Sequence, residues 1–322
     1  MTDRVPKRER GAALLTVLLL VALIAVIAGQ ALERLRLATR LAANAGGIEQ
    51  ARSYAEAAEV LATQRISTLL RADPGHVSLV GGWSGVPFAL PLPGGAAVAR
   101  VRDGGNCFNL NGLVTRTSDR AYVANPTAVD QFARLMRLLT VPTQTAAQVA
   151  ASASDWIDTD ADRQANGAED ERYLRQDPGY RTGGTLMADP SELRAVAGVT
   201  PDLYAQLRPW LCTLPMATPA PINVNTLAPE QAPLLAMLAP DGVGVDAVQG
   251  ALLRRPALGW RDVGAFQTAS GLTLGGGQAG VTTTWFALTV DVTLGTTELH
   301  ETATIDARRL PARLVARQWG EE

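Results

Sequence analysis

The chain begins with an apolar stretch that runs directly into an amphipathic one. Residues 12–32 (AALLTVLLLVALIAVIAGQAL) are apolar except at three positions: Thr16, Gly29 and Gln30. About 20 such residues, rising about 1.5 Å each along a helix, match the hydrocarbon core of a bilayer. Apolar and charged residues then alternate at helical spacing up to Asp73-Pro74-Gly75. The pattern predicts one long helix whose first half crosses a membrane.

The second half of this predicted helix carries a stripe of small and apolar residues: Ala51, Ala55, Ala58 and Leu61. The stripe makes this half amphipathic. Gly46 and Gly47 lie just before it and predict a weak point or kink in the helix.

Three further patterns organise the body of the chain. Residues 96–102 (AAVARVR) follow a turn-rich stretch and predict a short strand. Helical spacing occupies about 127–206 and returns over 229–271. The period then becomes two, and alternating runs predict an antiparallel meander over 286–294, 298–307 and 312–319. A strand before and strands after a helical block predict an α+β fold with a large inserted all-α domain.

The composition excludes several kinds of enzyme active site and argues against nucleic-acid binding. The 322 residues carry a net charge of −2, without the basic excess typical of nucleic-acid binding. Lys7 is the only lysine, so the body has no Schiff-base or phosphate-loop lysine. His76 and His300 are the only histidines, which excludes a three-histidine zinc site. Since GxSxG and HExxH motifs are also missing from the sequence, we expect a protein that is not an enzyme.

A short basic flank precedes the apolar stretch and consists of Arg4, Lys7, Arg8 and Arg10. By the positive-inside rule, this flank predicts a cytoplasmic N-terminus. A cleaved secretory signal peptide and a retained single-pass anchor both begin in this way. The apolar stretch does not end in a clear A-x-A-like cleavage site, and the helical pattern continues beyond it. These two features favour the retained anchor.

Several short motifs, in this order, give the chain a family resemblance. Gly11 stands between the basic flank and the apolar stretch, as in a prepilin peptidase site cut between Gly11 and Ala12. Thr16 occupies the fifth mature position, where most pilins carry a glutamate. Further along come CFNLNGLV at 107, DWIDTDADRQANGAEDERYL at 155, ELRAVAGV at 192, PINVNTL at 221 and WFALTVDV at 285. Over nearly its whole length the chain resembles type II secretion system protein K, a class of minor pseudopilin that lacks this glutamate.

The resemblance implies a fold and a cellular setting. The fold is that of a type IV pilin, a long helix on an antiparallel sheet, with an inserted all-α domain of SAM-like and helix-hairpin-helix-like units. The setting is the inner membrane, with a single membrane span and the body in the periplasm, after cleavage by prepilin peptidase and methylation. The implied position is the pseudopilus tip, with the I- and J-type minor pseudopilins and other type II secretion components.

On this basis we divide the chain into six segments. They are a leader (1–11), the transmembrane part of the helix (12–32), its periplasmic part (33–73), the first part of the pilin-like domain (74–125), the inserted α-domain (126–275) and the C-terminal strands (276–322).

An acidic segment at 155–171 is the candidate metal site. Counted from Asp158, carboxylates occupy EF-hand ligand places 1, 3, 5 and 12, and Gln164 offers a backbone carbonyl at place 7. Arg163 stands at place 6, where an EF-hand needs glycine, so we expect a related loop. The candidate ligands are Asp155, Asp158, Asp160, Asp162, Glu169, Asp170 and Glu171.

Hard oxygen ligands favour Ca²⁺, and a cation would offset the repulsion among so many carboxylates. The family resemblance also implies calcium in this segment. The alternative is a solvated acidic loop whose charges pair with arginines in the same segment: Arg163, Arg172 and Arg175.

Cys107 and Cys212 are the only cysteines. In an oxidising periplasm disulfides persist, and closing a loop of about 100 residues destabilises the unfolded chain by about 4.7 kcal/mol in the entropy model. Two independent buried thiols are the alternative, which spacing alone does not exclude. We expect a disulfide that ties the segment next to the sheet to the inserted domain.

The main rival function is that of a membrane-anchored DNA-uptake protein. Residues 222–266 resemble a helix-hairpin-helix module, with Gly242-Val243-Gly244 as a phosphate-binding hairpin beside Arg254 and Arg255. No lysine supplies phosphate contacts, and acidic residues surround the hairpin: Glu230, Asp241, Asp246 and Asp262. The charge pattern favours a packing unit, so we expect no nucleic-acid partner.

Overall fold

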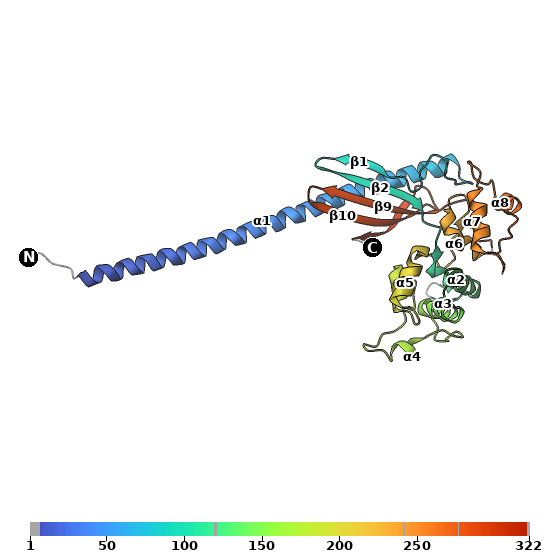
Figure 1. Cartoon of the computed structure of the whole chain (residues 1–322), viewed down its shortest axis with the longest axis horizontal. Helices are drawn as coiled ribbons and strands as arrows, with labels where there is room; N and C mark the ends of the chain where they lie inside the picture. Colours follow the sequence, from blue (N-terminus) through green and yellow to red (C-terminus); the bar gives the residue numbers. More distant parts are fainter. Residues whose placement is uncertain (1–6, 119–120, 241, 276, 321–322) are drawn as a thin grey trace, which may run out of the picture.

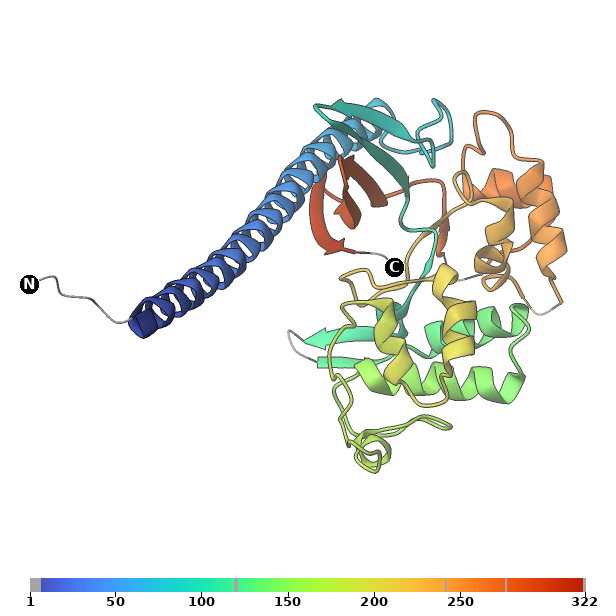
Figure 2. The same ribbon diagram turned by 60° about the vertical axis from the view of Figure 1, so that its left-hand side comes forward.

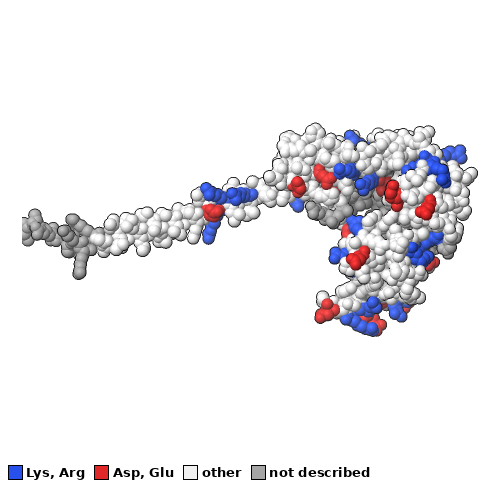
Figure 3. Space-filling view, in the orientation of Figure 1, with Lys and Arg blue, Asp and Glu red and all other residues white. Residues whose placement is uncertain are grey.

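A single helix, α1 (Lys7–Ala72), forms a rod that carries the rest of the molecule on its C-terminal half (Figure 1). The computed structural model describes residues 7–118, 121–240, 242–275 and 277–320, so residues 1–6 of the expected leader lie outside it. The first half of α1 is exposed, apolar and long enough to cross a membrane. Between residues 11 and 48 its charge is confined to one band, visible in Figure 3, made by Glu33, Arg34, Arg36 and Arg40.

A five-stranded antiparallel sheet covers the C-terminal half of α1. In spatial order its strands are β1 (Phe88–Leu92), β2 (Gly95–Asp103), β9 (Trp285–Leu294), β10 (Thr297–Asp306) and β11 (Arg313–Trp319). The period-two pattern gives the sheet one buried face, which on β9 presents Phe286, Leu288, Val290 and Val292. Because β2 pairs with β9, segments from the two ends of the body complete one sheet.

Small residues let this sheet lie close to the helix. Four alanines on one stripe of α1 are fully buried: Ala51, Ala55, Ala58 and Ala62. Leu61, which the sequence pattern placed on the stripe, is 38% exposed instead. α1 continues without a break through Gly46 and Gly47. A Cβ atom on Gly47 would lie 2.6 Å from the Thr297 hydroxyl, so this glycine permits the close approach of β10.

Between β2 and β9 the chain builds a helical unit that lies beside the sheet (Figure 2). Its helices are α2 (Pro126–Leu138), α3 (Thr143–Ile157), α4 (Asp170–Tyr173), α5 (Pro201–Leu207), α6 (Ala232–Ala236), α7 (Val245–Leu253) and α8 (Val263–Ser270). Short strands pair between them: β3 (Phe108–Asn109) with β6 (Leu211–Cys212), β4 (Val114–Ser118) with β5 (Ala121–Ala124), and β7 (Ile222–Asn223) with β8 (Ala279–Gly280).

Local chemistry explains where these helices begin and which face they bury. The Asn125 side chain caps α2 by accepting a hydrogen bond from the Ala128 backbone N–H, and Pro126 occupies the first helical position. The apolar face predicted for this helix is buried in the core of the helical unit through Phe132, Leu135 and Met136.

The α+β architecture with a helical insertion confirms the predicted fold class, with local differences. The turn-rich stretch before residue 95 contains β1, an edge strand that tolerates Pro91. Residues 158–189, predicted helical, are mostly irregular apart from α4. Residues 106–124, grouped with the pilin-like domain, contribute Phe108, Leu110 and Leu113 to the core of the helical unit. By its contacts, the helical unit therefore begins near residue 106.

Candidate metal centre and the junction of the two units

The acidic segment forms a loop between two helices. α3 ends at Ile157, the loop runs from Asp158 to Glu169, and α4 begins at Asp170. Backbone hydrogen bonds anchor the start of this segment, because Thr159 N–H donates to the Tyr122 carbonyl and Gly184 N–H donates to the Trp156 carbonyl. The chain therefore presents a helix–loop–helix with the length of an EF-hand loop.

Three of the predicted ligands converge in this loop. One carboxylate oxygen from each of Asp155, Asp158 and Glu169 lies within 4.8 Å of the other two. Asp155 and Asp158 are buried, Asp155 fully so, and Glu169 is partly buried. Asp158 Oδ1 and Glu169 Oε1 have no hydrogen-bond partner among the described residues. Buried carboxylate oxygens without donors are the atoms that a cation would satisfy.

Burial and like charge disfavour ionisation of these groups. Burial, followed by the charges of Asp160, Asp155 and Glu169, raises the pKa of Asp158 to about 8. Burial, followed by the charge of Asp155, raises the pKa of Glu169 to about 7. The pKa of Asp155 is also raised, chiefly by burial. A divalent cation at this point would reverse the balance and favour the charged forms.

Asp155 is positioned by the loop that it faces. The Gln164 side-chain amide donates to Asp155 Oδ1 at 2.8 Å, and the Gln164 backbone N–H also points to this carboxylate. Gly167 passes so close that an added Cβ would lie 2.0 Å from Asp155 Oδ2. The glycine that this loop requires is therefore at place 10, whereas an EF-hand requires one at place 6.

The other predicted ligands have different surroundings. Asp160 lines a surface cavity of about 800 Å³ together with Asp158 and Glu169, while the exposed Asp162 donates its backbone N–H to Asp160 Oδ1. Asp170 accepts hydrogen bonds from Thr182 and Arg181, and Glu171 pairs with Arg175. The structure thus brings Asp155, Asp158 and Glu169 together, with Asp160 at the mouth. Asp170 and Glu171 are paired with neighbouring groups outside this cluster.

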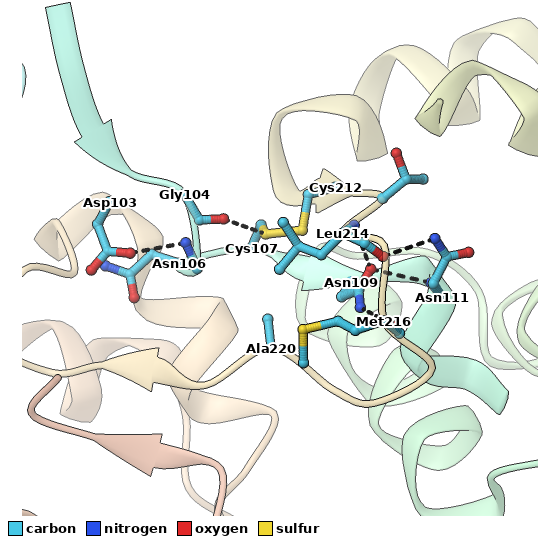
Figure 4. The surroundings of a disulfide bond; sticks show 12 residues. Asp103, Gly104, Asn106, Cys107, Asn109, Asn111, Cys212, Leu214, Met216 and Ala220 are labelled. Atoms are coloured by element: carbon cyan, nitrogen blue, oxygen red, sulfur yellow. Dashed lines mark hydrogen bonds between the residues drawn. A yellow bond between two sulfur atoms is a disulfide. The ribbon is translucent and has the colours of Figure 1, made fainter. Parts of the chain in front are cut away.

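The predicted disulfide between Cys107 and Cys212 is present, with a Cα–Cα distance of 5.8 Å (Figure 4). It lies where β3 pairs with β6, and Asn109 is aligned with Cys212. The Asn109 side chain accepts the Leu214 N–H and donates to the Met216 and Thr218 carbonyls. The bond therefore reinforces a contact that asparagine side chains also hold.

A second asparagine motif, missed as a functional feature by the sequence analysis, joins the two units. Asn223 donates to the Val77 carbonyl, which follows α1, and to the Thr283 hydroxyl, which precedes β9. Asn225 exchanges two hydrogen bonds with Trp260 in the helical unit. The sequence does contain a signal for this motif, because the spacing N-x-N occurs in both CFNLNG and PINVNT. In each pair, the side chain of the first asparagine accepts a hydrogen bond from the backbone N–H of the second.

The helix-hairpin-helix-like segment contains α6 and α7, but its arginines differ in role. Arg255 is half-buried and donates to the backbone carbonyls of Val224 and Leu227. These bonds engage one of the two arginines that the predicted phosphate site would use. Asp241, one of the predicted surrounding acids, lies outside the described residues.

The predicted processing residues, Gly11 and Ala12, lie near the start of α1 and are exposed. A Cβ atom on Gly11 would meet nothing within 4 Å, and Ala12 is exposed. Thr16 donates its hydroxyl to the Ala13 carbonyl at 2.8 Å, so its polar group is satisfied within the helix.

Comparisons with known proteins agree on one family. Two family models, both described as type II secretion system protein K, match residues 106–216 and 222–289. Type II secretion system protein K of Pectobacterium carotovorum is 32% identical over 319 residues, covering 97% of each chain. The protein of the same name from Klebsiella pneumoniae is 38% identical over 80% of this chain and 79% of its own.

A solved structure resembles most of this chain. It is a chain in the crystal structure of the GspK-GspI-GspJ complex from the enterotoxigenic Escherichia coli type 2 secretion system. The TM-score is 0.72 at 31% sequence identity, and the match covers 85% of this chain and 97% of that one.

Proposed function

Because the chain belongs to the type II secretion system protein K family, we propose that it is a minor pseudopilin at the tip of the secretion pseudopilus. There it initiates or caps assembly for protein export across the outer membrane, and its role is structural. The observation that carries the proposal is the combination of one exposed apolar helix, a sheet packed on its far half and a bulky helical unit beside that sheet.

The position of the helical unit supports the tip assignment. The unit lies to one side of the axis of α1 and widens the molecule at the end distant from the apolar half (Figures 1 and 2). Subunits in a shaft stack their helices side by side along one axis, so a broad body is accommodated best where no further subunit follows. Thr16 supports the same position. A shaft subunit uses a glutamate there to pair with the N-terminal amine of the subunit above, and a tip subunit has no such neighbour.

The partners and topology follow from this assignment. A protein K chain has been crystallised in complex with GspI and GspJ, and we propose that I- and J-type minor pseudopilins bind this chain too. We further propose an inner-membrane anchor at residues 12–32, a cytoplasmic N-terminus and a periplasmic body. Prepilin peptidase would cut between Gly11 and Ala12, with methylation of the new N-terminus, before contact with other secretion components.

We also propose that the loop binds Ca²⁺ through Asp155, Asp158 and Glu169, with Asp160 at the open side. The support is the convergence of three carboxylates, two of them on buried residues, the oxygen atoms without donors and the raised pKa values. Carboxylate oxygens are ligands that Ca²⁺ prefers. Bound calcium would neutralise the loop and hold α3, the loop and α4 together.

Co-purification tests the tip assignment. We expect the detergent-solubilised full chain, co-expressed with the I- and J-type pseudopilins of its own organism, to elute with both as one ternary complex. Each partner expressed singly with the chain is the control for non-specific association through the apolar helices. A chain that elutes alone while I- and J-type proteins form a complex with each other would contradict the proposal.

A further inference from the structure

A fully buried carboxyl group lies between α1 and the sheet. Glu301 lies on the inner face of β10, in the same alternating row as Ala303 and Ile305, and its exposed fraction is 0%. Both of its carboxyl oxygens are buried, and neither accepts a hydrogen bond from any donor in the part of the chain described. Directly opposite on β9 is Val290, which is apolar. An ionised carboxylate in such a place would lack compensation.

The nearest cation is already engaged. Arg317 on β11 donates from Nε and from a terminal nitrogen to the two oxygens of Glu59 on α1, each at 2.5 Å. Its other terminal nitrogen reaches Glu56 at 3.3 Å, while Glu301 Oε1 is 3.8 Å from Arg317 Nε, beyond hydrogen-bond distance. Three carboxylates thus surround one guanidinium.

Among the described residues, no further cation is placed to neutralise the excess negative charge. On α1, Arg52 pairs with Glu49 and lies over the ring of Trp319, which is aligned with Glu301 on β11. His300, the next residue on β10, pairs with Asp291 of β9. The Arg317 pair gives Glu59 two charge-assisted hydrogen bonds, whereas Glu301 accepts none among the described residues, so the group left to take up a proton is Glu301.

We propose that Glu301 is protonated at neutral pH and donates a hydrogen bond to the carboxylate of Glu59. Glu59, Glu301 and Arg317 then form a proton-dependent clasp between the N-terminal helix and the last two strands of the sheet. Burial, followed by hydrogen bonding and charge from Glu59, raises the pKa of Glu301 in agreement with this arrangement. Ionisation of Glu301 would put a second negative charge against Glu59 and weaken the contact.

The sign of the pH effect follows from linkage. Glu301 has an ordinary pKa of 4.5 in the unfolded chain and a raised pKa in the folded one. The stability from its proton is complete below the unfolded pKa and is lost as the pH rises through the folded pKa. Between the unfolded and the folded pKa of Glu301, the unfolding equilibrium constant of the wild type should rise up to tenfold per pH unit, relative to a variant with no titratable group at position 301.

The test is urea unfolding of the full chain in detergent, followed by tryptophan fluorescence at about pH 5, 6 and 7. Glu301→Gln keeps the shape of the side chain and its ability to donate to Glu59. We expect the ratio of unfolding constants, wild type over Glu301→Gln, to increase several-fold over each pH unit. Glu298→Gln, at an exposed position on the same strand, is the matched control and should give a constant ratio.

Glu59→Gln keeps the test decisive if Glu301→Gln does not fold. Without the Glu59 charge, Arg317 is free to pair with Glu301, so the carboxyl ionises and the wild-type pH dependence should disappear. If Glu301→Gln folds, a ratio of wild-type to Glu301→Gln unfolding constants that does not change with pH would overturn the proposal. If only Glu59→Gln folds, a constant ratio of wild-type to Glu59→Gln unfolding constants would overturn it.

Discussion

At the scale of single residues, the main feature is a set of like charges enclosed by protein. Asp155, Asp158 and Glu169 approach one another although burial and repulsion disfavour their charged forms. Such a cluster is stable in one of two ways: it binds protons or it binds a cation. If the cluster binds a cation, neutralising one carboxylate weakens that binding. If it binds protons, neutralising one carboxylate relieves repulsion.

Replacement of Asp158 by asparagine distinguishes these alternatives. With calcium at a hundredfold excess over its Kd, binding adds about 2.7 kcal/mol to the wild type, and chelation lowers its melting temperature accordingly. Asp158→Asn should lose most of this response, yet in chelator it should melt above the wild type because one like charge is gone. Differential scanning calorimetry measures both effects.

Asp130→Asn, an exposed change on α2, is the control and should keep the full response. A wild-type melting temperature that is indifferent to chelator would mean that these carboxylates are neutralised by protons alone.

At the scale of elements, the two halves of α1 have different surroundings. Its first half exposes apolar side chains, while its second half buries a stripe of alanines under the sheet. Changes in the first half should therefore act through membrane insertion, processing and assembly, and leave the folding of the body unaffected.

Gly11→Ala tests the processing site. Nothing lies within 4 Å of the added methyl group, so the fold should tolerate the change and any effect reports recognition by the peptidase. We expect the variant to keep its leader in cells that contain prepilin peptidase, while the wild type begins at Ala12. Intact-protein mass spectrometry gives the N-terminus.

Gly29→Ala is the matched control, since that glycine also lies on the exposed half of α1 with open space around it. It should be processed like the wild type. A Gly11→Ala chain that still begins at Ala12 would contradict the leader assignment.

At the scale of the whole molecule, the sheet and the helical unit are joined by a polar junction. Asp103, at the end of β2, accepts hydrogen bonds from Thr226 and Thr283, and Asn223 bridges the segment after α1 and the segment before β9. Burial raises the pKa of Asp103 to about 6. A junction made of directional bonds fixes the angle between two bodies more strictly than apolar packing does.

The disulfide should stabilise the helical unit beside this junction. Closing about 100 residues is worth up to about 4.7 kcal/mol in the entropy model, so reduction should shift urea unfolding to clearly lower concentration. Cys107→Ala, Cys212→Ala and the double variant should lose the same amount, because each removes the same bond. Losses that add up across the two single variants would show that the thiols contribute separately.

Much of this architecture was predictable because it depends on local patterns. The period-two runs predicted the strands of the meander, and the apolar stretch predicted the exposed half of α1. β1 was missed because glycine and proline around it signal turns, and an edge strand needs few ladder donors. Leu61 was assigned to the buried stripe in place of its neighbour Ala62, and successive residues of a helix point about 100° apart.

The sequence by itself determined the family, the fold class, the membrane-length helix, the acidic segment and the single possible pairing of two cysteines. Each of these depends on composition, periodicity or residues near one another in the chain. Tertiary structure alone decided which carboxylates of the segment meet, that Gly167 allows Asp155 to enter the loop, and that Glu301 is enclosed beside Glu59 and Arg317. These are distances between residues whose approach depends on the path of the whole chain, and residue type and spacing do not specify that path.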